Sequence, residues 1–262
     1  MIPLWIFQGV FLLGLSAPFL AVAVLARRAQ SLSKYWEIPF AFFIFTIAGA
    51  ADTFFLRGFI DYVLRETPRA NNPLASTVLG TVLAQLVSTL SIVIPIIVLT
   101  KTSGNGLSSI FIDKTRIRRG LVVGIIGFLV FYLGTAAGFN EGLFPNNGVT
   151  LSRFLALTPA ILVLVLSNGL REELWFRGIF LKKYGKFLGS LPSNILQATI
   201  FTAFHVQVQY TLKLLPFLGI TFILALWLGY LMQRSGNILA SSIFHAGGDI
   251  PIYLVFLSYT TT

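Results

Sequence analysis

Long apolar runs, each about the length of a bilayer-spanning helix, alternate with short polar segments along the chain. A transmembrane helix needs about 20 largely apolar residues. The runs are continuous rather than alternating between apolar and polar positions, which favours helices over the strands of a membrane barrel. Eight spans are expected, approximately at residues 2–26, 38–56, 76–100, 120–138, 154–181, 192–210, 214–232 and 238–257. The pattern therefore predicts an all-α polytopic membrane protein of about eight transmembrane helices.

Composition supports this class. Of the 262 residues, 56% are hydrophobic and 11% are charged, whereas soluble domains average about 25% charged residues. Such a chain is neither a soluble enzyme nor a nucleic-acid-binding domain, and its expected surroundings are membrane lipid. No long linker or internal repeat divides the chain, so residues 1–262 are expected to form a single membrane domain. The absence of cysteine excludes disulfides and Cys-ligated metals.

The net charge of +10 reflects membrane topology, because Lys and Arg lie mainly in the short segments between apolar runs. Twelve basic residues, among them Arg119, follow the odd-numbered runs, and five, among them Arg69, follow the even-numbered runs. The positive-inside rule then places the odd loops in the cytoplasm. Both termini are expected on the non-cytoplasmic side.

Ionisable side chains inside the predicted spans are the informative positions, since each costs at least about 2.5 kcal/mol at the bilayer centre. They are Asp52, Glu172, Glu173, His205, His245 and Asp249. All but one lie in the last four runs, where a single polar cavity could contain them. The exception, Asp52, stands near Arg57 and Asp61 and is expected to have a local ion-pair or interface role.

The fifth span contains two adjacent glutamates. Glu173 and Arg177 are spaced i,i+4 with the acid first, the favourable order for an ion pair within a helix. Adjacent helical residues are rotated by about 100°, so the two glutamates are not expected to share one task. Glu172 is left without a partner, on the same face as Asn168. This arrangement predicts a general base in a polar cavity.

The sixth and eighth spans each contain a histidine with a neighbour at i,i+4. Phe201 can form a wall beside His205, and Asp249 can either orient His245 or face a ligand together with it. At 1.5 Å per residue, Glu172, His205 and His245 lie about 15, 20 and 11 Å from the basic ends of their spans. We therefore expect one cavity that opens toward the cytoplasm.

Three patterns resemble, in this order, the three motifs of the CPBP family. They are Glu172-Glu173-x-x-x-Arg177, Phe201-x-x-x-His205 and His245-x-x-x-Asp249. This family comprises intramembrane proteases of the CAAX prenyl endopeptidase and bacteriocin-processing (Abi) group. The resemblance places a catalytic core at residues 153–258. It implies an intramembrane endopeptidase whose substrate is a membrane-associated peptide or protein, with or without a lipid modification.

The resemblance also implies roles for individual residues. Glu172 and His205 activate a water molecule, and His245 with Asp249 stabilises the oxyanion. Glu173 and Arg177 form a supporting ion pair, while Phe201 and Asn168 line the pocket. No cofactor is expected. The alternative is a Zn²⁺-dependent protease with Glu172, His205, His245 and Asp249 as ligands, although no His-Glu-x-x-His motif is present.

The last motif position takes Asn or Asp in the family, and Asp249 leaves its role open. An ionised carboxylate only accepts hydrogen bonds, whereas an amide donates them. Asp249 is therefore either a protonated donor, a group that orients His245, or a metal ligand. A different class of function also stays open: a non-catalytic or proton-coupled membrane protein that uses the same acids and histidines.

Overall fold

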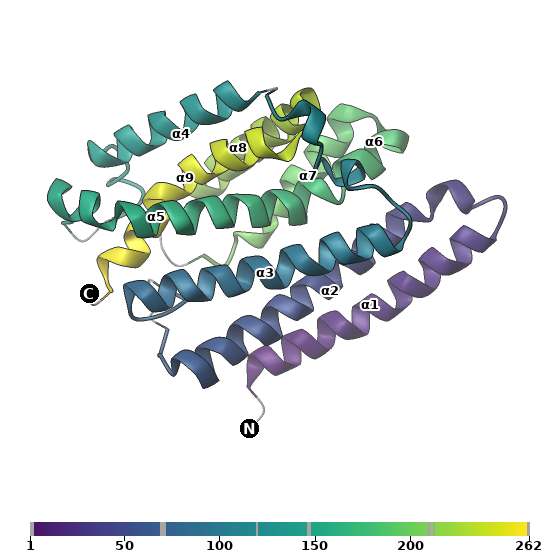
Figure 1. Cartoon of the computed structure of the whole chain (residues 1–262), viewed down its shortest axis with the longest axis horizontal. Coiled ribbons are helices and arrows are strands. Elements are labelled where there is room, and N and C mark those ends of the chain that lie inside the picture. The colour runs from purple at the N-terminus through teal and green to yellow at the C-terminus, as the bar shows by residue number, and fades with distance from the viewer. Residues whose placement is uncertain are drawn as a thin grey trace.

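The computed structural model describes residues 3–68, 72–118, 120–145, 148–208, 211 and 213–260. Within these residues the chain forms nine α-helices and no strand, which confirms the predicted all-α class (Figure 1). Arg69 and Arg119, used for the topology, and Tyr210, the expected end of the sixth span, lie outside the described residues. The helices are α1 (Leu4–Arg28), α2 (Glu37–Gly58), α3 (Val78–Thr102), α4 (Leu121–Ala136), α5 (Leu151–Glu172), α6 (Leu181–Leu188), α7 (Ser190–Phe204), α8 (Leu214–Ser235) and α9 (Ile238–Ser258).

Helices occupy all eight predicted spans, and α6 is a short additional helix between the fifth and sixth. Six segments of the described residues are long and apolar enough to cross a bilayer. The helices at the fourth and sixth predicted spans, α4 and α7, have only 16 and 15 residues. The ends of α4 are set by Gly120 and Gly138, whose positive φ angles interrupt a right-handed helix. The chain is an integral multi-pass membrane protein.

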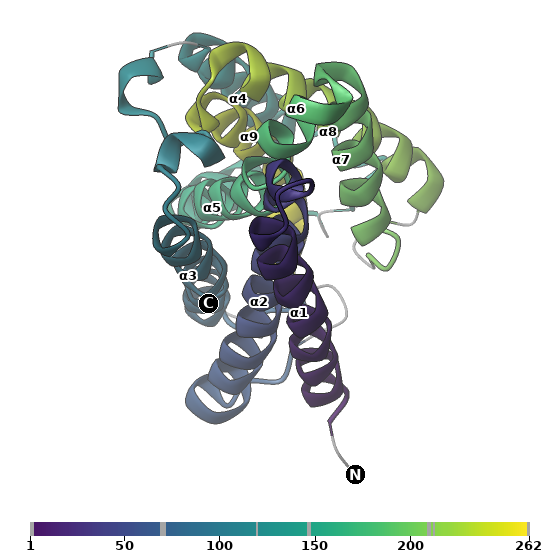
Figure 2. The ribbon, with the colours of Figure 1, turned by 90° about the vertical axis from the view of Figure 1, so that its right-hand side faces the viewer.

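Successive long helices run in opposite directions, so the connections fall at two ends of the bundle (Figures 1 and 2). The connections after α1, α3 and α8 lie at one end together with α6. The connections after α2, α4 and α7 lie at the other, with the start of α1 and the end of α9. Figure 2 shows α1 and α2 extending as a pair away from the remaining helices. We refer to this second end as the terminal end.

Helix α9 is the central helix, and most of its side chains are buried. Helix α4 packs closely on it because glycines face it. A Cβ atom at Gly124 would lie 2.6 Å from the Ala240 carbonyl oxygen, and one at Gly127 would overlap the Phe244 ring. The glycines at these positions therefore allow the backbones of α4 and α9 to approach closely. By contrast, a Cβ at Gly134 would meet only ordinary contacts.

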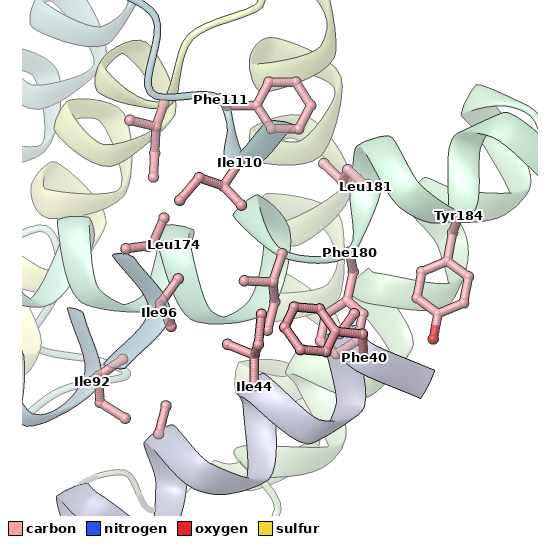
Figure 3. Close-up of a cluster of buried hydrophobic side chains, with 14 of the residues drawn as sticks. Phe40, Ile44, Ile92, Ile96, Ile110, Phe111, Leu174, Phe180, Leu181 and Tyr184 are labelled. Carbon is pink, nitrogen blue, oxygen red and sulfur yellow. The ribbon is translucent and has the colours of Figure 1, made fainter. Parts of the chain in front are cut away.

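A cluster of buried apolar side chains joins α2 and α3 to a π-helical segment, η5 (Glu173–Gly178), that follows α5 directly (Figure 3). Ile44 comes from α2, Ile92 and Ile96 come from α3, and Leu174 comes from η5; all four are fully buried. Because this cluster fixes Leu174, it also fixes the neighbouring Glu173.

The connection between α2 and α3 is fastened by Glu66. Its carboxylate accepts hydrogen bonds from the backbone N–H groups of Ser76 and Thr77 at 2.7 and 2.9 Å and from both hydroxyls. Burial alone raises the pKa of Glu66, but these hydrogen bonds outweigh it and hold the pKa below its ordinary value. The adjoining residues Pro73 and Leu74 are thereby held over the terminal end of the bundle.

Candidate active site

The chain changes from α to π geometry between the two adjacent glutamates. Helix α5 ends at Glu172, and η5 begins at Glu173. A π-helix closes i→i+5 hydrogen bonds, so its turn is wider and successive side chains are rotated by less than in an α-helix. Trp175 fastens this segment by donating an indole hydrogen bond to the Phe45 carbonyl at 3.1 Å. The wider turn allows neighbouring side chains to approach a common target.

Glu173 lies at the centre of a buried charge cluster. Its Oε1 accepts a hydrogen bond from Arg177 Nη1 at 2.5 Å and another from His245 Nδ1 at 2.7 Å. Glu173 and Arg177 are fully buried, and the His245 side chain is 4% exposed. The predicted Glu173–Arg177 ion pair is present. In addition Glu173 holds the His245 ring, a task that the sequence analysis gave as one of three alternatives for Asp249.

The other nitrogen of His245 faces two further carboxylates. Its Nε2 lies 3.6 Å from Glu172 Oε2 and 3.6 Å from Asp249 Oδ1. Both separations are too long for direct hydrogen bonds and are suited to a bridging water. The two adjacent glutamates thus face different nitrogens of the same imidazole. Their shared approach to His245 did not follow from regular α-helical rotation, and their separate tasks stay a prediction.

Glu172 has a partner, contrary to the sequence-based expectation. Its Oε1 accepts a hydrogen bond from Arg171 Nη2 at 2.8 Å. The other terminal nitrogen, Arg171 Nη1, donates to Ser88 Oγ of α3 at 2.5 Å. Glu172 therefore has one oxygen bound to a guanidinium and the other, Oε2, directed toward His245.

Asp249 belongs to a polar chain that crosses three helices. Its Oδ2 accepts a hydrogen bond from Asn168 Nδ2 at 2.8 Å. The Asn168 carbonyl accepts from Gln85 Nε2 at 3.4 Å, and Gln85 Oε1 accepts from the Tyr253 hydroxyl at 2.6 Å. One face of Asp249 is thus fixed by α3 and α5, while Oδ1 faces His245.

His205 caps the end of α7. Its Nδ1 is 2.8 Å from the Phe201 carbonyl oxygen, which only accepts hydrogen bonds. Nδ1 therefore carries the hydrogen, and in the neutral ring Nε2 holds the lone pair. The Phe201 ring lies 4.5 Å from the His205 ring and 5.7 Å from the His245 ring. Phe201 forms the wall expected beside His205 and reaches His245 as well.

Two cavities share lining residues of the site. An apolar cavity of about 730 Å³ lies among α4, α7, α8 and α9, and its lining includes His245. A second, more polar cavity of about 270 Å³ has Asn168, Arg171 and Glu172 in its lining. His205, Asp249 and Ile252 line both cavities. We call the region around these three residues the junction of the two cavities.

Both cavities extend toward the terminal end of the bundle. The apolar cavity reaches Leu143 and Phe144 in the connection after α4. The polar cavity reaches Leu74 before α3 and Val208 after α7. The side of the membrane on which the termini lie, and the side to which these cavities open, stay predictions.

Asp52 is closer to this site than the sequence suggested. Its Oδ1 accepts a hydrogen bond from Ser91 Oγ at 3.1 Å. It also interacts electrostatically with Arg171 of α5 and with Arg57 of its own helix. The expected local ion-pair or interface role of Asp52 stays a prediction.

Several polar residues of the site were missed because the sequence search considered acids and histidines. They are Gln85, Ser88, Arg171 and Tyr253. A signal was available for two of them. Gln85, Ser88 and Ser91 recur every three residues in an apolar span, so they form a polar stripe on one face of α3.

Zinc dependence, with Glu172, His205, His245 and Asp249 as ligands, stays a prediction. Among the described residues, no group of three or more metal-ligating side chains is placed to hold an ion. The Arg171 guanidinium also occupies one oxygen of Glu172.

Comparison with known proteins agrees with the motifs. Residues 154–250 match the family described as type II CAAX prenyl endopeptidase Rce1-like. All eight candidate residues named from the sequence fall within this segment. No curated protein and no solved structure matches the chain. The resemblance to CAAX-type intramembrane proteases is therefore confirmed over residues 154–250, which make up 97 of the 262 residues.

Proposed function

We propose that the protein hydrolyses a peptide bond of a membrane-embedded substrate with a water molecule activated by Glu172 and His205. The family supports an endopeptidase acting on a membrane-embedded protein or peptide. The observation that supports the mechanism is the junction of the two cavities, where His205 and Asp249 line both and Glu172 and His245 each line one.

In the first step, water binds between Glu172 Oε2 and His205 Nε2. Glu172 Oε2 accepts one proton while the water oxygen attacks the substrate carbonyl carbon, and the carbonyl π electrons move to its oxygen. A positioned general base contributes about 10²–10⁴ in rate. Arg171 supports this assignment because it occupies Oε1 and leaves Oε2 as the basic oxygen.

The oxyanion needs a donor that is already oriented. His245 suits this role because Glu173 fixes its Nδ1 at 2.7 Å, so a proton on Nε2 points toward the junction. Asp249 stands beside the same nitrogen, at 3.6 Å. Losing one such donor typically costs about 10²–10³ in rate.

In the second step the oxyanion re-forms the carbonyl and the C–N bond breaks. Glu172 returns its proton to the leaving amine, so the enzyme ends in its starting state. The products are a carboxylic acid, which then ionises, and an amine, without a covalent intermediate. We further propose that the apolar cavity accommodates the apolar part of the substrate, including a lipid chain where one is present.

The test uses purified protein in liposomes and an internally quenched peptide ending in a farnesylated Cys-aliphatic-aliphatic-Met sequence. Glu172→Gln should reduce cleavage by at least about 100-fold, since it removes the base at nearly constant volume. The matched control is Glu37→Gln, which alters an exposed ion pair with Lys186 and should cleave normally. Glu172→Gln activity within tenfold of wild type, or proton flux without cleavage by wild type, would refute the proposal.

A further inference from the structure

Arg171 connects the family-matched segment to helices that lie outside it. It is the last residue but one of α5, yet its side chain reaches Ser88 of α3 and interacts with Asp52 of α2. Neither α2 nor α3 falls within residues 154–250. Glu172, the proposed base, is therefore coupled to the N-terminal half of the protein through one guanidinium.

The surroundings of this guanidinium indicate a fixed structural position. The Arg171 and Glu172 side chains are only 15% and 13% exposed. A buried cation requires opposite charge close by; Glu172 contacts Arg171 at 2.8 Å, and Asp52 interacts with it electrostatically. Ser91 in turn donates to Asp52 at 3.1 Å. These contacts form a network that runs from α2 through α3 to the base.

The hydrogen bonds at Arg171 favour a role in orienting Glu172. Its Nη1 donates to Ser88 and its Nη2 to Glu172. These two contacts fix the plane of the Glu172 carboxylate and direct Oε2 toward His245. Three of the five guanidinium N–H groups remain, and Nε is buried without a hydrogen-bond partner, so the experiment below includes a test for binding of a substrate carboxylate.

We propose that Arg171 is a positioning residue that orients the Glu172 carboxylate for catalysis, and that Ser88 and Asp52 hold Arg171 in place. This inference rests on the proposed function. It extends the catalytic apparatus beyond the family-matched segment to α2 and α3.

The experiment measures kcat and KM of the reconstituted full chain with the farnesylated peptide, alongside thermal unfolding of each variant. Arg171→Met should lower kcat by about 10- to 100-fold, as expected for loss of a charge-assisted hydrogen bond, with KM within about twofold. Arg171→Lys should recover part of the loss, since an ammonium retains the charge but not the two-pronged geometry. Arg153→Met, on an exposed part of the same helix, is the matched control and should behave as wild type.

Two further variants address the network without removing the cation. Ser88→Ala and Asp52→Asn should each lower kcat by about three- to tenfold. Combined with Arg171→Met, Asp52→Asn should add less than about twofold, because coupled residues are not additive. Ser88→Ala and Arg171→Lys decide the question if Arg171→Met does not fold.

Three results would overturn the inference. One is a kcat within about twofold of wild type in folded Arg171→Met and Ser88→Ala. Another is full additivity of Asp52→Asn with Arg171→Met. The third is a rise in KM alone that disappears with a C-terminally amidated peptide, which would make Arg171 a substrate-binding residue. If one of these three results is found while Glu172→Gln is inactive, only the inference about Arg171 fails. If Glu172→Gln cleaves the peptide, or if the wild type does not, the proposed function is refuted as well.

Discussion

Replacing Glu173 by Gln should destabilise the protein strongly, because Glu173 is the buried counter-charge of Arg177 and also holds His245. Arg177 is fully buried, and its guanidinium otherwise lies 4.5 Å from the centre of the Phe201 ring. Breaking a buried ion pair by removing one partner costs about 3–5 kcal/mol. For a chain of this size, 1 kcal/mol shifts Tm by about 2–4 °C. The expected fall in Tm is therefore about 6–20 °C.

A double variant separates stability from catalysis. In Glu173→Gln combined with Arg177→Met, no cation is left without a partner, so most of the lost Tm should return. Peptide cleavage should not return, because His245 Nδ1 still lacks the carboxylate that fixes its ring. The single variant thus loses both thermal stability and peptide cleavage, and the double variant recovers thermal stability alone.

Intrinsic fluorescence of the four tryptophans reports unfolding in detergent, and the farnesylated peptide reports activity. Glu37→Gln serves as the control for charge removal at an exposed pair. A fall in Tm of less than about 2 °C for the single variant would show that the pair contributes little to stability. Recovery of activity in the double variant would refute the role of Glu173 in holding His245.

Three other outcomes follow from the site and its packing. Asp249→Asn should cleave the peptide within about tenfold of the wild-type rate and remain insensitive to chelator, since an amide can donate a hydrogen bond to the oxyanion. Wild-type cleavage that is lost with chelator and returns with zinc would contradict this. Gly169→Ala should lower Tm by about 2–12 °C, because the new Cβ would lie 2.5 Å from the Ser242 carbonyl oxygen. The control is Gly219→Ala, which should not lower Tm because Gly219 faces open space. Because its pKa is lowered in the folded state, the ionised Glu66 carboxylate stabilises the fold. This contribution to the free energy of unfolding is complete above the ordinary pKa of 4.5 and is lost as the pH falls through the folded-state pKa. The Tm of Glu66→Gln should therefore fall less than that of wild type between about pH 6 and about pH 3.5, and equal falls would contradict this.

The sequence was sufficient to predict the helical class and to predict that the acids and histidines inside the last four spans lie close together. Charged side chains inside apolar spans are rare and need partners. The Glu173–Arg177 pair followed from spacing alone. The shared approach of Glu172 and Glu173 to His245 did not, since it depends on the local change to a π-helix. Periodicity at 100° per residue cannot reveal such a change.

The partners of the acids were harder to predict than the acids themselves. Arg171 lies next to Glu172 in the sequence, but its second contact, Ser88, is 83 positions away. Asp249 reaches α3 through Asn168 and Gln85 in the same way. These contacts depend on which helices are neighbours in space. In the sequence, the polar stripe on α3 is the signal that points toward them.

The extension of both cavities toward the terminal end ties the route of the substrate to the orientation of the whole chain. If the loops richest in Lys and Arg are cytoplasmic, then the scissile bond is reached from the opposite compartment, and a soluble cytoplasmic protein cannot be the direct substrate. If the termini are cytoplasmic, proteins lipidated in the cytosol have direct access. Phe139 is 87% exposed and lines the apolar cavity. Since the chain has no cysteine, a Phe139→Cys variant can be labelled at this one position with an impermeant maleimide in intact cells. One labelling measurement thereby identifies the compartment that supplies both the water and the peptide.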